Sequence, residues 1–238
     1  MHHRIYTADR LESGAAVEVS GEEFHHTARV ARVHEGEEVE LFDGRGNGAA
    51  GTIESSASDR LTVRVRELLP SRESPLRITL AMAIIQLDRF EIVLQKATEL
   101  GAVAIIPLVT DRVEVRPERY RRKNERWQKI VFEAVKQSGR SRIPLLEAPA
   151  TFDEVILRDG IRMVFDADAE PTPPTPLETP AGLTLLVGPE GGWSEAEIEQ
   201  ARRSGCGFAR LGPRRLRAET AAIVACGLMQ ARYGDWGW

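Results

Sequence analysis

The sequence predicts an α/β protein that combines a small β-rich unit with a larger unit built on a mostly parallel sheet. Short segments of alternating apolar and polar residues occupy roughly the first 70 residues, whereas apolar runs alternate with amphipathic helical segments after Pro75. Between the two patterns, the segment from Pro70 to Pro75 combines two prolines with polar residues, as linkers do. We therefore expect one domain over residues 1–72 and a second over residues 73–238.

In the N-terminal unit, apolar and polar residues alternate over residues 17–19, 38–42 and 61–66, which is typical of strands. An Asp-Gly pair opens the turn-rich segment 43–48 and indicates a hairpin. Residues 22–32 place Phe, Thr and Ala side chains on one side of a short helix. Because several short strands joined by turns are typical of small barrels, we expect a barrel here.

The larger unit alternates predicted strands and helices. Its apolar, strand-like runs are residues 76–85, 103–109, 161–165, 183–187 and 208–211. Helical spacing extends over residues 89–100, 119–139 and 219–233, and capping boxes begin two more helices, at Thr151–Glu154 and Ser194–Glu197. This alternation implies a mostly parallel sheet that is covered on both faces. Five prolines mark an exposed loop, namely Pro171, Pro173, Pro174, Pro176 and Pro180.

Composition limits the classes of function. The 238 residues are 42% hydrophobic and 29% charged, as in ordinary soluble globular proteins. No apolar run approaches the ~20 residues that cross a bilayer, and the N-terminus has no apolar signal-peptide core, so we expect a cytoplasmic protein with no membrane partner. Cys206 and Cys226 are too few for a disulfide framework or a cysteine-based zinc site. All histidines lie in the first 34 residues, and we expect no metal.

Charge is segregated along the chain. The net charge of −4, from 32 basic and 36 acidic residues, argues by itself against nucleic acid as a partner. Residues 112–142, however, contain eleven basic and four acidic side chains, and residues 202–217 contain six arginines and no acid. Because a local basic patch attracts a polyanion whatever the mean charge, these segments indicate a nucleic-acid footprint. Solvated helix faces are the alternative, which fits the second segment less well because it lacks compensating acids.

A glycine-rich turn follows the strand expected at residues 183–187. In an open parallel sheet, ligands lie beyond the carboxyl ends of the strands. Here Gly188-Pro189-Glu190-Gly191-Gly192-Trp193 gives a rigid turn over which a flat ligand can lie against backbone. No Lys-Ser/Thr pair follows, so the turn is not a P-loop, and the missing Gly-x-Gly-x-x-Gly spacing disfavours a nucleotide-dependent oxidoreductase. A tight turn without a ligand is the alternative.

A second Gly-Pro turn follows the strand expected at residues 208–211. Gly212-Pro213 leads into a helix whose first turn carries Glu219 and Thr220. A helix N-terminus offers unpaired backbone donors, and Arg217 lies immediately before this one. Glu219 also complements the helix dipole, which alone would explain its place. Matching Gly-Pro turns at two strand ends favour a functional role over coincidence.

Five ordered motifs carry a family resemblance that covers nearly the whole chain. They are residues 96–101 (KATELG), 125–130 (ERWQKI), 137–140 (QSGR), 188–192 (GPEGG) and 211–221 (LGPRRLRAETA). In this order and spacing they resemble the RsmE family of bacterial 16S rRNA (uracil-N3)-methyltransferases, which belongs to the SPOUT superfamily. Arg4-Ile5-Tyr6 and residues 25–36 resemble that family's N-terminal domain. Trp193, where leucine or phenylalanine is commoner, and the proline-rich loop depart from the family pattern.

The resemblance implies a PUA-like N-terminal β-barrel, a C-terminal SPOUT domain with a trefoil knot, and a homodimer. It also implies S-adenosylmethionine as methyl donor, with S-adenosylhomocysteine as product and no metal. General rules against threaded chains would have excluded the knot. Transferred to this sequence, the cofactor-binding residues are Leu186, Gly188, Glu190, Gly191, Gly192, Leu211, Gly212, Leu216, Arg217 and Thr220, with Phe165 as a weaker candidate.

Methyl transfer to uracil N3 requires particular side-chain chemistry. In-line displacement depends mainly on positioning, and N3 is a weakly acidic imide whose lone pair becomes available on deprotonation. A base near N3, or a cation that stabilises the developing anion, is therefore expected. We expect Arg217 or Arg140 to supply the positive charge, and Glu219 to orient it or accept the proton.

The expected partner is 16S rRNA in the small ribosomal subunit. Phosphate contacts would position the RNA, whereas specificity would come from an unstacked uridine in the pocket. We expect phosphate contacts from Arg4, Arg29, Arg32, Arg121, Arg122, Arg126 and Lys129. Two alternatives stay open at this point: a SPOUT methyltransferase that acts on another RNA, and a non-catalytic RNA-binding factor for ribosome assembly.

Overall fold

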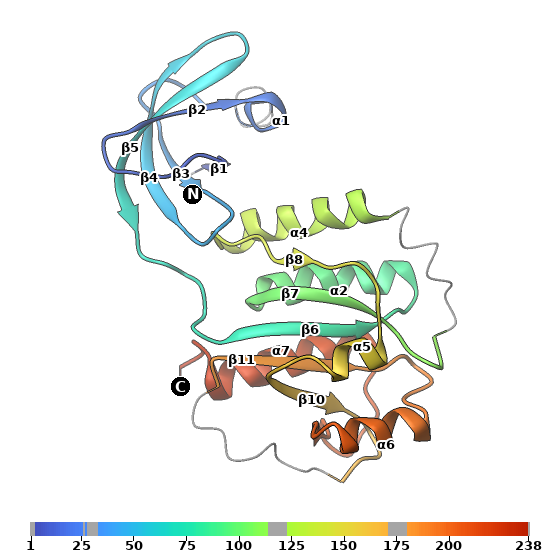
Figure 1. Ribbon diagram of the computed structural model, residues 1–238. Coiled ribbons are helices and arrows are strands. Elements are labelled where there is room, and N and C mark those ends of the chain that lie inside the picture. Colours follow the sequence, from blue (N-terminus) through green and yellow to red (C-terminus); the bar gives the residue numbers. More distant parts are fainter. Residues whose placement is uncertain (1–2, 26, 28–32, 114–122, 171–179, 238) are drawn as a thin grey trace. The chain divides into compact units, whose positions relative to one another are not determined.

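The computed structural model describes residues 3–25, 27, 33–113, 123–170 and 180–237, which are traced in Figure 1. Contacts divide the chain into two compact units. Unit 1 comprises residues 1–73 and 135–143, and unit 2 comprises residues 74–134 and 144–238. The domain boundary expected between residues 72 and 73 stays a prediction, and the sequence pattern had not indicated that residues 135–143 group with the N-terminal unit.

Unit 1 is a curled five-stranded sheet with strand order β1-β3-β4-β5-β2 (Figure 1). β1 pairs with β3 in parallel, and the other neighbours are antiparallel. Alternate residues such as Leu41, Ile53 and Val63 form its buried core, as the period-2 pattern predicts. The elements are β1 (His3–Tyr6), β2 (Ala16–Ser20), α1 (Gly21–Phe24), β3 (Glu38–Phe42), β4 (Gly48–Ser56) and β5 (Arg60–Leu69).

The hairpin expected after residue 42 is confirmed. β3 and β4 pair with Phe42 opposite Gly48. The Asp43 carboxylate accepts hydrogen bonds from the backbone N–H groups of Arg45 and Asn47, at 2.7 and 3.1 Å, and thereby organises the turn. These hydrogen bonds, with those from the Asn47 and Arg45 side chains, hold the pKa of Asp43 below its ordinary value although burial acts to raise it.

Unit 2 is built on a parallel sheet with the order β12-β10-β11-β6-β7-β8, and β9 also pairs with β7. This arrangement confirms the parallel α/β prediction. The strands are β6 (Arg77–Ala83), β7 (Ala102–Val109), β8 (Leu145–Leu146), β9 (Ala150–Thr151), β10 (Ile161–Phe165), β11 (Gly182–Val187) and β12 (Gly207–Ala209). The helices are α2 (Leu87–Glu99), α4 (Asn124–Ser138), α5 (Phe152–Ile156), α6 (Glu195–Arg203) and α7 (Ala218–Tyr233).

Helices cover both faces of this sheet. On one face, Ala81, Ile106 and Leu186 form a buried cluster with side chains of α5 and α6. Strand side chains alternate between faces, so Leu80 and Leu185 point to the opposite face, where α2 and α7 pack against each other and against the strands. Both predicted capping boxes, which begin α5 and α6, are formed.

Some element ends differ from the sequence pattern. The helix expected over residues 119–139 is α4, and residues 119–122 lie outside the described residues. Of the helix expected over residues 22–32, α1 (Gly21–Phe24) is described, and residues 26 and 28–32 lie outside the described residues. β12 is shorter than the strand expected over residues 208–211. Across the described ranges, no helix combines the length and the apolar character that a bilayer crossing requires.

Candidate active site

Three adjacent strands of unit 2 end at one cavity. β10 lies between β11 and β12, and all three run parallel, so their carboxyl ends meet at the same edge of the sheet. The loops that follow them line a cavity of about 970 Å³. Further walls come from α6, from the start of α7 and from Arg112, which follows β7.

The turn after β11 owes its shape to its glycines. Gly192 has a φ of +68°, a conformation that side-chain-bearing residues rarely adopt, and its N–H donates to the Pro189 carbonyl at 2.9 Å. A Cβ on Gly188 would lie 3.0 Å from the Trp193 indole, so the ring needs a glycine there. Gly191 and Gly192 line the cavity without side chains, so a flat ligand can lie against their backbone.

Trp193 ties this turn to the neighbouring strand. Its indole N–H donates to the carbonyl of Phe165, the last residue of β10, at 3.0 Å. Its ring lies 5.1 Å from the Phe152 ring and is 6% exposed. One side chain therefore anchors the Gly188–Gly192 turn to the end of β10.

The turn after β12 leads into α7. Gly212 has a φ of +74°, and Arg217 is the N-cap residue of α7, with an exposed side chain. Glu219 lies in the first turn of the helix. Its Oε2 atom is buried and has no hydrogen-bond partner within the described part of the chain. Glu219 is not among the residues that line the cavity, and a buried carboxylate oxygen without a partner is costly unless a proton or another group satisfies it.

The cavity wall carries charges of both signs. Arg215 pairs with Asp168 at 2.5 Å and so links the loops after β12 and β10. The basic lining residues are Arg112, Arg202, Arg214, Arg215 and Arg217, and the acidic ones are Asp166, Asp168, Glu190, Glu195 and Glu199. In the described part of the chain, no group of three or more His, Cys, Asp or Glu residues could hold a metal ion. The site therefore offers backbone groups, apolar side chains and paired charges.

Eight of the ten predicted cofactor residues line this cavity: Gly188, Glu190, Gly191, Gly192, Leu211, Gly212, Leu216 and Arg217. Phe165, the weaker candidate, also lines it. Leu186 is instead fully buried in the core of unit 2, and Thr220 is exposed on α7, so neither belongs to the lining. The geometry shows proximity to the cavity, and cofactor binding by these residues stays a prediction.

Sequence reasoning missed several lining residues. Asp166, Ala167 and Asp168 follow β10, and Arg112 follows β7. The available signal was that residues 161–165 form a strand of the same parallel sheet, whose carboxyl end shares an edge with the others. Neither loop has a distinctive glycine pattern to mark it.

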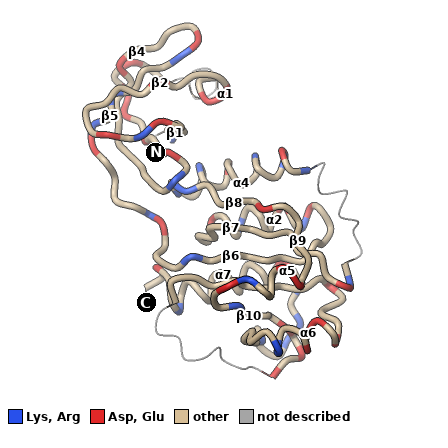
Figure 2. Tube along the Cα trace, in the orientation of Figure 1, with Lys and Arg blue, Asp and Glu red and all other residues tan. Residues whose placement is uncertain are grey.

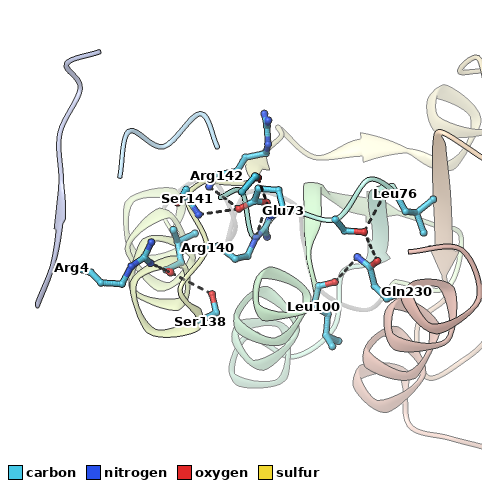
Figure 3. Close-up of polar contacts among 12 residues, drawn as sticks. Arg4, Glu73, Leu76, Leu100, Ser138, Arg140, Ser141, Arg142 and Gln230 are labelled. Atoms are coloured by element: carbon cyan, nitrogen blue, oxygen red, sulfur yellow. Dashed lines mark hydrogen bonds and ion pairs between the residues drawn. The ribbon is translucent and has the colours of Figure 1, made fainter. Parts of the chain in front are cut away.

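Arg140, a predicted source of positive charge, lies in unit 1. The residue is 4% exposed, and its Nη2 atom contacts the Glu73 carboxylate at 2.6 Å (Figure 3). The backbone N–H groups of Ser141 and Arg142 donate to the same carboxylate, both at 3.0 Å. Burial acts to raise the pKa of Glu73, but these hydrogen bonds and the charge of Arg140 outweigh it and hold that pKa below its ordinary value. The contacts thus give Arg140 a structural role in unit 1, and a catalytic role stays untested.

The basic side chains predicted to contact RNA differ in their exposure and in whether they already form ion pairs. Arg4 in unit 1 is 11% exposed and is bonded to Glu40 and to the Val135 carbonyl. Lys and Arg recur along α4 (Figure 2), where Arg126 forms a bidentate pair with Glu91, at 2.6 and 2.7 Å, and Lys129 is exposed. The other predicted contacts lie outside the described residues: Arg29, Arg32, Arg121 and Arg122.

Comparison with known proteins identifies relatives over nearly the full length. An RNA methyltransferase domain family matches residues 72–230, and an RNA methyltransferase PUA domain family matches residues 19–66. The chain is 31% identical over 233 residues to the ribosomal RNA small subunit methyltransferase E of Bacillus subtilis, covering 92% of this chain and 91% of that protein.

Two solved structures are similar throughout. The ribosomal RNA small subunit methyltransferase E of Neisseria gonorrhoeae, solved with bound S-adenosyl methionine, has 32% identity and a TM-score of 0.90, with full coverage of both chains. A Legionella pneumophila protein solved with bound SAM has 35% identity and a TM-score of 0.85, covering 99% of this chain and 100% of that one. These likenesses confirm the fold class expected from the sequence motifs.

Proposed function

Because the chain belongs to the RsmE family of ribosomal RNA small subunit methyltransferases, we propose that it transfers a methyl group from S-adenosylmethionine to N3 of one uridine in 16S rRNA of the small ribosomal subunit. The observation that carries this proposal is the cavity at the ends of β10, β11 and β12. Its glycine-rich turn and its apolar residues suit a cofactor without phosphates. Relatives of this length and fold have been solved with that cofactor.

The residues present fit the proposed cofactor. S-adenosylmethionine supplies an electrophilic methyl group on a sulfonium, and binding it requires no phosphate-holding lysine. Gly188, Gly191 and Gly192 line the cavity without side chains, and a Cβ on Gly188 would come within 3.0 Å of the Trp193 indole. Leu211 and Leu216 offer apolar surface on the opposing loop, which suits an adenine ring.

We propose that two residues at the start of α7 act on the uracil that receives the methyl group. Arg217 is exposed at the cavity and would stabilise negative charge that develops on the uracil as N3 loses its proton. Glu219, with its partnerless Oε2, would accept that proton or orient Arg217. The described contacts favour Arg217 over Arg140 as the source of charge, since Arg140 is buried against Glu73.

RNA recognition is assigned to both units. We propose that residues 1–72 form the RNA-recognition domain and residues 73–238 the methyltransferase domain, in line with the two matched families. Lys129 on α4 is exposed and fits a phosphate contact. Arg126 would have to leave Glu91 to make one, and Arg4 offers little surface.

A homodimer in the cytoplasm completes the proposal. The large apolar side chains of Leu228 on α7 and Trp236 after it are each 48% exposed, and a second copy of the chain that packed on them would remove their apolar surface from water. The ribosomal substrate of the relatives supports a cytoplasmic location.

Calorimetry with S-adenosylmethionine separates this proposal from a non-catalytic RNA-binding factor. We expect binding by the wild-type protein, and about tenfold weaker binding by Gly188→Ala, because the new Cβ must push Trp193 away. Gly182→Ala is the matched control, since it lies at the other end of β11 and its Cβ would make only ordinary contacts, of 3.4 Å or more. No measurable heat with the wild-type protein would favour the non-catalytic factor.

A further inference from the structure

Two arginines from outside the glycine-rich turn hold its centre. The Nη1 atom of Arg112 donates to the Gly191 carbonyl at 2.8 Å, and the Nη1 atom of Arg89 on α2 lies 2.9 Å from the Glu190 carboxylate. We propose that Arg112, assisted by Arg89, is a positioning residue that sets the conformation of the Gly188–Gly192 turn for cofactor binding. This inference rests on the proposed function, because it assigns the turn to the cofactor.

The turn needs an external restraint because it is rich in glycine. Glycine backbone is the most costly of all to order, and Gly192 can adopt many conformations besides its φ of +68°. The peptide that joins Gly191 to Gly192 is held at both ends: its carbonyl accepts from Arg112, and its N–H donates to the Pro189 carbonyl. Without Arg112, only the N–H end would resist rotation of this peptide.

Arg112 is itself presented by a hydrogen-bonded ring at the start of α6. The Ser194 hydroxyl donates to Asp111 Oδ2 at 2.6 Å, and the Asp111 N–H donates to Glu197 Oε1 at 3.0 Å. The other Glu197 oxygen accepts from the Ser194 N–H at 2.8 Å, and Glu197 is 4% exposed. The ring fixes the backbone beside Arg112 to the same α6 terminus that the turn enters, so the arginine is placed before any ligand binds.

Glu190, a predicted cofactor residue, takes part in the weaker of the two contacts. Its carboxylate pairs with Arg89, and its side chain is 45% exposed. An exposed pair of this kind contributes modestly, so Arg89 is the weaker of the two restraints. Contact of Glu190 with the cofactor stays a prediction.

The competing role for Arg112 is a phosphate contact, because it begins the basic segment of residues 112–142. The two roles predict different kinetic changes. Loss of a positioning residue weakens binding of S-adenosylmethionine and leaves the KM for RNA unchanged. Loss of a phosphate contact raises the KM for RNA and leaves the affinity for S-adenosylmethionine unchanged.

The test compares Arg112→Ala, Arg112→Lys and Arg89→Ala in the full-length protein. We expect Arg112→Ala to raise the Kd and KM for S-adenosylmethionine about tenfold, with kcat at saturating cofactor and the KM for RNA within twofold of wild type. Arg112→Lys should recover most of the affinity, because its ammonium can still donate to a carbonyl, and Arg89→Ala should weaken binding about twofold to threefold. Arg158→Ala is the matched control, since Arg158 pairs with Glu147 at 2.8 Å away from the cavity lining.

Hydrogen exchange in the cofactor-free protein distinguishes failure of this inference from failure of the proposed function. Arg112→Ala should speed exchange of the Gly192 amide, and Arg158→Ala should not. If Arg112→Ala speeds exchange of the Gly192 amide but the wild-type protein binds no S-adenosylmethionine, the arginine holds the turn and the proposed function is wrong. The assignment of the turn to the cofactor then fails with it. Unchanged cofactor affinity in Arg112→Ala, with a raised KM for RNA, would overturn the inference alone.

Discussion

Arg217→Ala and Glu219→Gln are each expected to lower kcat at least about a hundredfold with the RNA substrate, because each removes a group that acts on the charge or the proton of uracil N3. Arg217 lines the cavity and is exposed. Glu219 is outside the lining but, two residues further along α7, has a buried oxygen without a partner in the described part of the chain. Affinity for S-adenosylmethionine should change little in Glu219→Gln, since the amide keeps the shape of the side chain. Single-turnover methylation at saturating cofactor measures the effect.

Arg210→Ala provides the control for this pair. Arg210 is an exposed arginine of the same basic segment but is not among the residues that line the cavity. Its loss should leave single-turnover rates within about twofold of wild type, as for a surface charge. If Arg217→Ala and Glu219→Gln both turn over at the wild-type rate with unchanged cofactor affinity, the catalytic assignment is wrong.

Trp193→Ala is expected to destabilise the protein by about 4 kcal/mol and to abolish measurable cofactor binding. The substitution removes a ring that is 6% exposed, packs on Phe152 and donates to the Phe165 carbonyl. For a unit of this size the loss corresponds to a Tm lower by about 10 °C. Cofactor binding is lost because the Gly188–Gly192 turn is no longer anchored to the end of β10. Thermal unfolding and calorimetry measure the two effects.

Two further variants distinguish the loss of core packing from the loss of the hydrogen bond between Trp193 and Phe165. Trp193→Phe keeps an aromatic ring but loses the hydrogen bond to Phe165, and it should cost about 1–2 kcal/mol. Phe90→Leu reduces packing on the opposite face, in α2, and should lower the Tm without changing cofactor affinity below the transition. A Trp193→Ala protein that binds S-adenosylmethionine like the wild type would contradict the role given to the indole.

Local sequence was sufficient to predict the turns that form the centre of the site. Glycine at positions 192 and 212 is required by the left-handed backbone there, and proline beside glycine marks a strand end. The Ser194 capping box likewise predicts where α6 begins, because its hydrogen bonds join residues only three apart. Features of this kind depend on neighbours in the chain and can be predicted without the fold.

Contacts between distant residues could not be predicted in the same way. Arg140 belongs to a basic segment in the sequence, but Glu73, which neutralises it, lies 67 positions earlier. Glu91, which pairs with Arg126, lies on a different helix. A charge pattern along the chain therefore overstated how many cations are free to meet RNA. Asp168 joins the site only because β10 lies between β11 and β12, an order that chain position does not give.

The most direct measurement of the central claim is mass spectrometry of nucleosides and mapped fragments from ribosomal RNA of a strain that lacks this protein. We predict the loss of a single N3-methyluridine from 16S rRNA, with all other modifications retained, and its return when the wild-type chain is supplied but not when Arg217→Ala is supplied. An unchanged 16S rRNA modification pattern, or the loss of a methyl group from a different RNA or a different atom, would contradict the account.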